Sequence, residues 1–337
     1  MRQTRHVADP PYTIKPEVLR RFDQGNTAFS LLAREQCAPP TTTPQSRPAR
    51  GDGFHNDFTG PEHSIEDGAS DSLARIGRFV HNRFRRLFED AAPAAPPAGA
   101  ERPADPAANA KMVKHAARQF GADLAGICEV NPLWVYARDE EGRKVELPAS
   151  HRWAVVMATA MDADAIRRSA PAANAATHLG YMRMAIHASC LARFIEELGH
   201  AAVACRNDTA LSIPLAIDAG LGEMGRSGSL ITPRFGPCVR LCKVFTDMPL
   251  AADSPIEFGV GETCRACRRC AEACPAGAIS TAPAPSFETV CPANNPGVLR
   301  YPVNAVECLR HWRRTGRSCS ACLAACPLTP SGQTDTG

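Results

Sequence analysis

The sequence predicts a layered α/β domain of about 150 residues followed by a smaller, cysteine-rich domain. Three observations indicate this fold class. Helix-like and strand-like patterns alternate from residue 111 onward, two closely spaced cysteine runs lie between residues 264 and 326, and 337 residues suffice for about two domains. A hydrophobic content of 44% is ordinary for a packed protein, so the chain is able to bury a sizeable core.

The first part of the chain differs in composition from the rest. Residues 1–110 are rich in Pro, Gly, Ser, Asp and Ala, and residues 91–110 read as a linker, so we expect a partly disordered extension. Residues 72–90 are the exception, because apolar residues recur there at helical spacing among arginines. Such a basic amphipathic helix can lie on an anionic membrane, but packing of its apolar face against the protein's own core is commoner.

The α/β pattern of the core follows in order along the chain. Short, mostly apolar runs predict strands, and apolar residues spaced three and four apart predict helices that end at glycines. Pro214 belongs in the first turn of the last helix. The expected elements are a helix over 111–121, strands over 122–130 and 153–161, a helix over 181–199, a strand over 201–205 and a helix over 209–222.

The two cysteine runs have the spacing of a bacterial two-cluster ferredoxin. In the first run the cysteines are separated by two, two and three residues, and Pro275 follows the last. In such a run the fourth cysteine ligates the other cluster. A zinc ribbon or a disulfide framework is the alternative. The sequence predicts one [4Fe-4S] cluster on Cys264, Cys267, Cys270 and Cys326, and a second on Cys274, Cys308, Cys319 and Cys322.

Charge and hydropathy narrow the cellular context. A formal net charge of +3 is too small to indicate a nucleic-acid partner. No apolar run approaches the roughly 18 residues that span a bilayer, and no apolar segment follows the basic residues near the N-terminus. We therefore expect a cytoplasmic protein that does not associate with membranes.

Several motifs together resemble one family. Residues 207–250 (NDTALSIPLAIDAGLGEMGRSGSLITPRFGPCVRLCKVFTDMPL), 178–185 (HLGYMRMA) and 294–309, with the two cysteine runs, are similar to the cobalamin-dependent reductive dehalogenases. The similarity covers about residues 111–328 and favours the non-exported type that lacks a twin-arginine leader. It implies a nitroreductase-like core over 111–258 that holds a base-off corrinoid, a ferredoxin-like domain over 259–330 and a tail over 331–337.

The resemblance also implies roles for particular residues. Tyr181 corresponds to the proton donor, Asn207 to an amide-bearing pocket residue and Arg240 to its cationic partner. From the residues alone, Tyr181 suits core packing, Asn207 an Asx turn and Arg240 a surface ion pair. The corrinoid is expected against the glycine-rich segment, where backbone can approach a large ligand closely. The residues expected to contact it are Gly225, Ser227, Gly228, Ser229 and Leu230.

The implied reaction is reduction of a carbon–halogen bond in an organohalide. Electrons would pass through the two clusters from an external low-potential donor such as ferredoxin or flavodoxin, since the chain has no fused reductase domain. One alternative is an enzyme similar to the epoxyqueuosine reductases, which share the cofactor set but continue into an RNA-binding region. The other is a non-catalytic iron–sulfur protein that transfers electrons.

Overall fold

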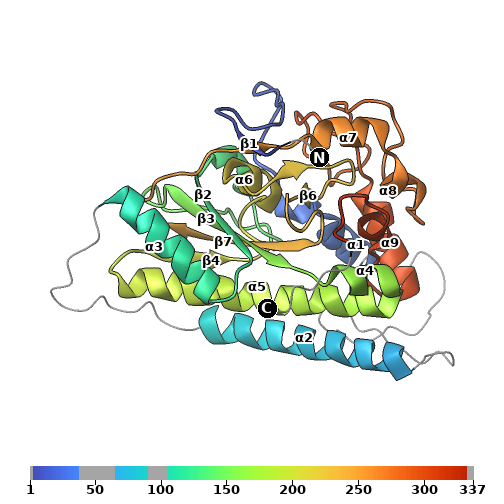
Figure 1. Ribbon diagram of the computed structural model, residues 1–337, viewed down its shortest axis with the longest axis horizontal. Helices are drawn as coiled ribbons and strands as arrows, with labels where there is room; N and C mark the ends of the chain where they lie inside the picture. Colours follow the sequence, from blue (N-terminus) through green and yellow to red (C-terminus); the bar gives the residue numbers. More distant parts are fainter. Residues whose placement is uncertain (1–2, 38–64, 90–104, 332–337) are drawn as a thin grey trace.

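The computed structural model describes residues 3–37, 65–89 and 105–331 (Figure 1). Its central sheet has the strand order β2-β3-β7-β4, and every neighbouring pair is antiparallel. β3 and β7 pair along their whole length, with Val155 opposite Val244. Most of the expected linker and the expected tail lie outside the described residues. The four strands are β2 (Leu124–Glu129), β3 (Trp153–Ala160), β4 (Ala202–Cys205) and β7 (Val239–Thr246).

Helices cover both faces of this sheet, which gives the mixed α/β fold that the sequence predicted. On one face, α3 (Pro106–Gln119) and α5 (Ala170–Glu197) pack Val113 and Leu191 against the strands (Figure 1). On the other face, α6 (Ser212–Asp218) buries Leu215 completely. The sheet core is therefore sealed on both sides, and the functional side chains lie at its ends and edges.

Most expected elements of the core are present, with two differences. Gly121 has a φ of 101° directly after α3, which is the left-handed conformation that a helix-ending glycine adopts. The long helix α5 starts at Ala170, earlier than the expected residue 181. The central strand β7 was not predicted, because Arg240 and Lys243 interrupt its apolar pattern. Short elements between these are η2 (Pro132–Trp134) and α4 (Ala163–Arg168).

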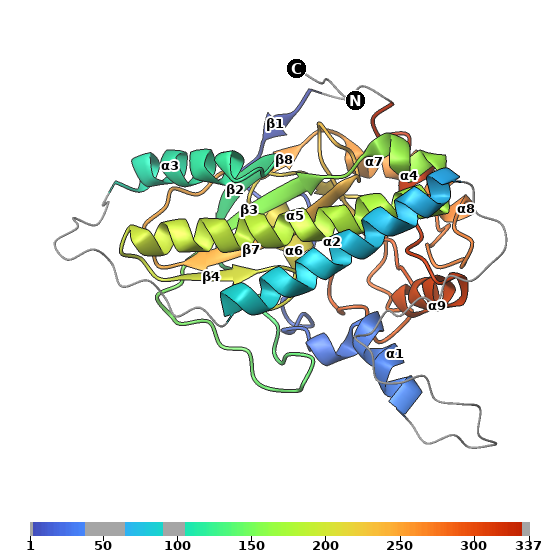
Figure 2. The same cartoon turned by 90° about the horizontal axis from the view of Figure 1, so that it is seen from below.

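The amphipathic helix α2 (Ile65–Glu89) lies along α5, as Figure 2 shows. The helix thus packs against the protein's own core, as expected. Among its described side chains, the packed face includes the small residues Ala74 and Gly77, and a Cβ at Gly77 would meet the His178 backbone at 3.0 Å. Of the residues expected on the apolar face, Leu73 and Ile76 stay exposed, as does Phe79.

Residues 3–37 pack against the rest of the protein, in contrast to the expected loosely ordered extension. β1 (Arg5–His6) pairs with β8 (Ile256–Glu257), and α1 (Ala28–Cys37) lies against α9 (Ala305–Thr315). Between them, Leu19 is only 1% exposed and belongs to the main core. A short 3-10 helix, η1 (Gln24–Asn26), precedes α1. The apolar residues of this segment are what the composition argument overlooked.

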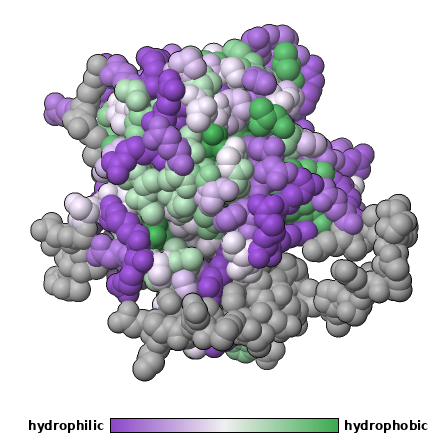
Figure 3. Space-filling model, turned by 90° about the vertical axis from the view of Figure 1, so that its right-hand side faces the viewer, coloured by the Kyte–Doolittle hydropathy of each residue, from purple (hydrophilic) through white to green (hydrophobic). Residues whose placement is uncertain are grey.

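The cysteine-rich part lies at one end of the sheet (Figure 1). It contains α7 (Val260–Ala266), α8 (Arg269–Glu272), α9 and α10 (Ala321–Ala324). A hairpin of β5 (Glu223–Met224) and β6 (Leu230–Ile231) connects it to the core. Figure 3 views this end of the molecule and shows many hydrophilic side chains around a paler, more apolar surface. Among the described residues, none of the helices has the length and apolarity to cross a membrane.

Candidate active site

The structure brings Tyr181, Asn207 and Arg240 together from three different elements. Tyr181 lies in α5, Asn207 in the loop after β4, and Arg240 in β7. The Asn207 Nδ2 donates a hydrogen bond to the Tyr181 hydroxyl at 3.2 Å. The Arg240 guanidinium carbon lies 4.8 Å from the centre of the Tyr181 ring, which is within cation–π range. The phenol is therefore contacted by an amide and a cation at once.

The Tyr181 and Asn207 side chains line an open cavity of about 580 Å³. His81 from α2 lies beside them, with its Nδ1 3.0 Å from the Tyr181 carbonyl oxygen. His178 is one turn before Tyr181, and burial, together with the charges of Arg78 and Arg240, lowers its pKa to about 4. Since His178 is neutral near pH 7, Arg240 is the permanent charge next to the Tyr181 ring.

Arg240 itself is only partly satisfied. Its Nη2 donates to the Thr177 hydroxyl at 3.2 Å, whereas its buried Nε has no hydrogen-bond partner among the described residues. An unpaired buried donor of a charged group is costly and calls for an explanation. The charge of Arg240 is thus only partly compensated by hydrogen bonds while it lies beside the Tyr181 ring.

A buried lysine holds the loop that carries Asn207. Lys243 is completely buried in β7, and its Nζ donates to the carbonyl oxygens of Arg206 and Ala210 at 2.8 Å each and to the Ser212 hydroxyl at 3.0 Å. Within this loop Thr209 has a φ of 67°, which is unusual for a β-branched residue. Sequence reasoning missed Lys243, because a lone lysine in an apolar strand gives no signal of its partner.

The first group of thiols lies around α7 and α8. Burial raises the pKa of the Cys270 thiol to about 11, and the neighbouring sulfurs of Cys264, Cys326 and Cys267 raise it further. Burial also raises the pKa of Cys264, and the same neighbours contribute. The four sulfurs are thus close enough to interact electrostatically, although Cys326 comes from the far end of the cysteine-rich part.

The second group lies against α9 and α10. Burial raises the pKa of Cys308 to about 11, and Cys274 and Cys319 add to the increase. Burial raises the pKa of Cys322 to about 12, and the neighbouring thiols of Cys308, Cys319, Cys270 and Cys274 raise it further. Cys322 therefore also lies near Cys270 of the first group, and the crossed assignment of the thiols to two clusters stays a prediction. In the described part of the chain, no three His, Cys, Asp or Glu side chains meet at a position for a single metal ion.

A separate, mostly apolar cavity of about 320 Å³ lies beside the glycine-rich segment. Ser227 and Gly228 line it, as do Trp134 and Tyr301. Leu230 does not line it, because its side chain is 2% exposed and packs in the main core. The remaining expected corrinoid contacts, Gly225 and Ser229, are also absent from its wall, and a Cβ at Gly225 would meet Ile231 at 2.9 Å.

A half-buried carboxyl group lies next to the aromatic residues of this cavity. Asp218, at the end of α6, accepts hydrogen bonds from the Tyr12 hydroxyl at 2.7 Å and from the Trp134 Nε1 at 3.1 Å. Burial raises the pKa of Asp218 to about 6, although both hydrogen bonds oppose the increase. Sequence reasoning missed this cluster because Tyr12 lies more than 200 positions away, in the segment that was expected to be loosely ordered.

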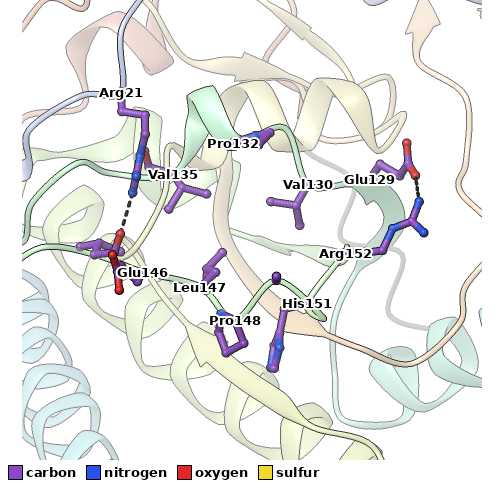
Figure 4. A pocket seen from close by; sticks show the side chains of 12 residues that line it. Arg21, Glu129, Val130, Pro132, Val135, Glu146, Leu147, Pro148, His151 and Arg152 are labelled. Carbon is purple, nitrogen blue, oxygen red and sulfur yellow. Dashed lines mark hydrogen bonds and ion pairs between the residues drawn. The ribbon is translucent and has the colours of Figure 1, made fainter.

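Another hollow, of about 470 Å³, lies near the ends of β2 and β3 (Figure 4). Val130 and Leu147 line it, and Glu129 and Arg152 form a 2.9 Å ion pair at its rim. None of the residues that the sequence analysis proposed for a site lies in its wall. Its other polar side chains are Arg21, Glu146 and His151, and the Glu129–Arg152 pair is largely exposed.

Comparison with known proteins identifies relatives of the chain. No protein-family model matches it. The tetrachloroethene reductive dehalogenase of Sulfurospirillum multivorans is 35% identical over 257 residues, which cover 67% of this chain and 51% of that protein. The enzyme of the same name from Desulfitobacterium hafniense is 36% identical over 261 residues, 64% of this chain and 47% of the relative. The chain thus spans about half the length of the curated relatives it matches.

The fold leads to the same family. A solved reductive dehalogenase, described with a mechanism for B12-dependent dehalogenation, matches 98% of this chain and 45% of its own with a TM-score of 0.75 at 25% identity. By contrast, similarity to the epoxyqueuosine reductase of Bacillus anthracis extends over only 61 residues, 18% of this chain. The extent of the sequence similarity and the shared fold place this chain in the reductive dehalogenase family.

Proposed function

We propose that this chain catalyses reductive dehalogenation, in which a carbon–halogen bond of an organohalide is reduced at a base-off corrinoid. The observation that carries the proposal is the contact of the Tyr181 hydroxyl with the Asn207 amide beside the Arg240 guanidinium, at the wall of an open cavity. The names of the relatives, which act on chlorinated ethenes, support the same reaction class. In the reaction the carbon–halogen bond breaks, two electrons and a proton are taken up, and halide leaves.

The residues present suit the implied cofactors. The apolar cavity beside Ser227 and Gly228 offers an aromatic and aliphatic wall that suits part of a corrinoid, and the two sets of four thiols are the ligand sets of two [4Fe-4S] clusters. We assign the corrinoid to the core over 111–258 and the clusters to a ferredoxin-like domain over 259–330. When bound, the corrinoid supplies low-potential electrons for the cleavage. The proposed donor is an external ferredoxin or flavodoxin.

The protein's own side chains supply the proton. Because Asn207 donates its N–H to the Tyr181 oxygen, the phenolic proton is not used in that bond and can point into the cavity. A phenol gives up a proton reluctantly at neutral pH, since its ordinary pKa is about 10. Arg240 favours the phenolate by its charge and cannot itself lose a proton. We therefore assign Tyr181 as the general acid. Asn207 orients its hydroxyl group, and Arg240 stabilises the negative charge of the phenolate.

The test compares two substitutions that each remove one hydroxyl group. Tyr181→Phe keeps the ring and its packing but removes the proton, so halide release should fall by roughly 10²- to 10⁴-fold. Tyr136→Phe, at a buried tyrosine outside the cavity, should leave turnover near that of the wild type. Halide is measured with a low-potential chemical reductant, which bypasses the protein donor. Both variants should keep about eight irons and one corrinoid per chain.

Two outcomes would contradict the assignment. Full halide release from Tyr181→Phe would remove Tyr181 from the mechanism and leave the cavity as a binding site without its acid. A wild-type chain that holds both clusters and the corrinoid, yet releases no halide from any chlorinated or brominated substrate, would favour a protein that only transfers electrons.

A further inference from the structure

Arg226 is a buried cation that connects the hairpin of the core to the first group of thiols. It lies in the turn between β5 and β6 and is only 1% exposed. Its guanidinium stacks on the Tyr301 ring at 3.7 Å. Among the described residues no carboxylate forms an ion pair with it, whereas most other buried charges in proteins have one.

The guanidinium is saturated by backbone carbonyl groups of the cysteine-rich part. Nε donates to Cys264 O and Cys267 O at 3.1 Å, and Nη2 donates to Cys264 O at 2.8 Å. Nη1 donates to Ser280 O at 2.8 Å and to Ala282 O at 2.9 Å. The planar fork therefore clamps two segments, 264–267 and 280–282, onto the core.

The backbone of the same residue contacts a thiol directly. The Arg226 N–H points to the Cys264 sulfur at 3.4 Å. Hydrogen bonds to cluster sulfurs, local net charge and solvent exposure are what set the reduction potential of an iron–sulfur centre. Arg226 thus contributes two of these factors, a charge and a hydrogen bond, at one sulfur.

The second group of thiols has a cation nearby in the sequence that is held differently from Arg226, because Arg317, two positions before Cys319, forms a 2.9 Å ion pair with Asp71. Its Cys274 sulfur receives the backbone N–H of Ala278 at 3.3 Å. The groups that act on Cys308 and Cys322 are burial, other thiols and Trp312, with no arginine or lysine among them. A full positive charge held in a low-dielectric interior acts far more strongly than an exposed one. The two centres therefore differ in that the buried cation beside the first, Arg226, has no carboxylate partner among the described residues, whereas Arg317 beside the second is neutralised by Asp71.

We propose that Arg226 is a positioning residue that raises the reduction potential of the centre at Cys264, Cys267, Cys270 and Cys326 above that of the centre at Cys274, Cys308, Cys319 and Cys322. The inference rests on the proposed function, since it requires both clusters. This difference in reduction potential gives electron transfer a direction. An electron that enters at the second centre moves downhill in energy to the first centre, which the Arg226 hairpin joins to the core.

The test is a redox titration followed by electron paramagnetic resonance on reconstituted wild-type, Arg226→Gln and Arg226→Lys proteins. Arg226→Gln should lower the equilibrium constant for one-electron reduction of the first centre at least tenfold, a shift of 59 mV, and leave the second unchanged. Arg226→Lys keeps the charge, so its shift should stay within about threefold. A Cys308→Ala background, which removes a ligand of the second centre, identifies which signal belongs to the first.

Arg269→Gln is the matched control, because it removes the same charge from an exposed position next to Cys270. Solvent should screen that change and make its shift the smaller one. Full clusters in Arg226→Gln with a first-centre potential no lower than that of Arg269→Gln would overturn the inference and leave the proposed function intact. If Arg226→Gln does not fold, a tenfold shift in Arg226→Lys would equally overturn it. A wild-type chain that takes up no iron and sulfide would overturn the proposed function and the inference together.

Discussion

Two buried cations hold functional segments of this protein, and they do so in different ways. Arg226 is 1% exposed and reaches four carbonyl oxygens on two separate segments, whereas Lys243 is fully buried and connects the two ends of one short loop. The planar guanidinium suits a bridge between segments, and the compact ammonium suits the closure of a tight loop. Neither forms an ion pair with a carboxylate among the described residues. Hydrogen bonds to backbone carbonyl groups therefore offset most of the cost of burying each charge.

The difference also affects how each charge responds to its surroundings. Burial lowers the pKa of Lys243, while the thiol of Cys205 and the carboxylate of Asp208 oppose the decrease. An arginine stays charged at any pH that a folded protein survives. Arg226 is therefore a permanent charge next to a group of thiols, and Lys243 is a support for the loop of Asn207. Substituting each by an apolar residue of similar length should separate these roles.

Arg226→Met should give the largest effect on stability. It leaves four partly buried carbonyl oxygens without their donor, so we expect the free energy of unfolding to fall by about 4 kcal/mol. The measurement is anaerobic urea unfolding of the protein without cofactors, which separates this loss from any effect on cluster binding. A loss below about 1 kcal/mol would show that water replaces the guanidinium at these carbonyl groups.

Lys243→Met should cost somewhat less, about 3 kcal/mol, because two carbonyl oxygens and one hydroxyl lose their donor. It should also reduce halide release while cluster content stays normal, since Asn207 loses its support. Lys114→Met is the control. Its ammonium forms a partly exposed ion pair with Asp253, and its removal should cost no more than about 1 kcal/mol. Normal halide release from Lys243→Met would show that this lysine is not needed to support the site.

Asp218, a half-buried acid, gives the third and smallest effect, because protonation can remove its charge and so limit the cost of its burial. The folded-state pKa of Asp218, about 6, is higher than the usual value for an aspartate, so the folded state holds its proton more tightly than the unfolded chain. The stabilisation is complete below pH 4 and is lost as the pH rises through about 6. We expect the wild type to lose about 2 kcal/mol over this range relative to Asp218→Asn. Parallel stability profiles of the two proteins would contradict the raised pKa.

The same residues show how far the sequence could predict the structure. β2, β3 and β4 were expected from their apolar patterns, whereas β7 was missed because Arg240 and Lys243 stand in it. Helix α2 and its packing on the core were expected, but the exposure of Leu73 and Ile76 was not, since an apolar pattern does not reveal that Ala74 and Gly77 allow closer packing.

The site was predicted unevenly for a similar reason. That Tyr181, Asn207 and Arg240 lie together was predicted only from resemblance to a family. The three residues belong to separate elements, so no sequence spacing indicates that they are neighbours. The thiol groups were expected from a local spacing rule. Arg226 and Asp218 were missed, since a charged residue whose partners are backbone carbonyl groups or distant aromatic residues has no sequence signature.

The packing of residues 3–37 has a consequence for the order in which the protein folds. Ile14 bridges to Val298, Arg5 pairs with Glu257, and α1 rests on α9, so this early segment finds partners roughly 250 to 280 residues later in the chain. Contacts so distant in sequence slow folding, because a long loop must close before they form. At roughly 10 residues per second, a ribosome needs about half a minute to deliver those partners. During that time Leu32 stays without Val306 and Leu309, the distant residues that it packs against, so its apolar surface is buried only late in synthesis.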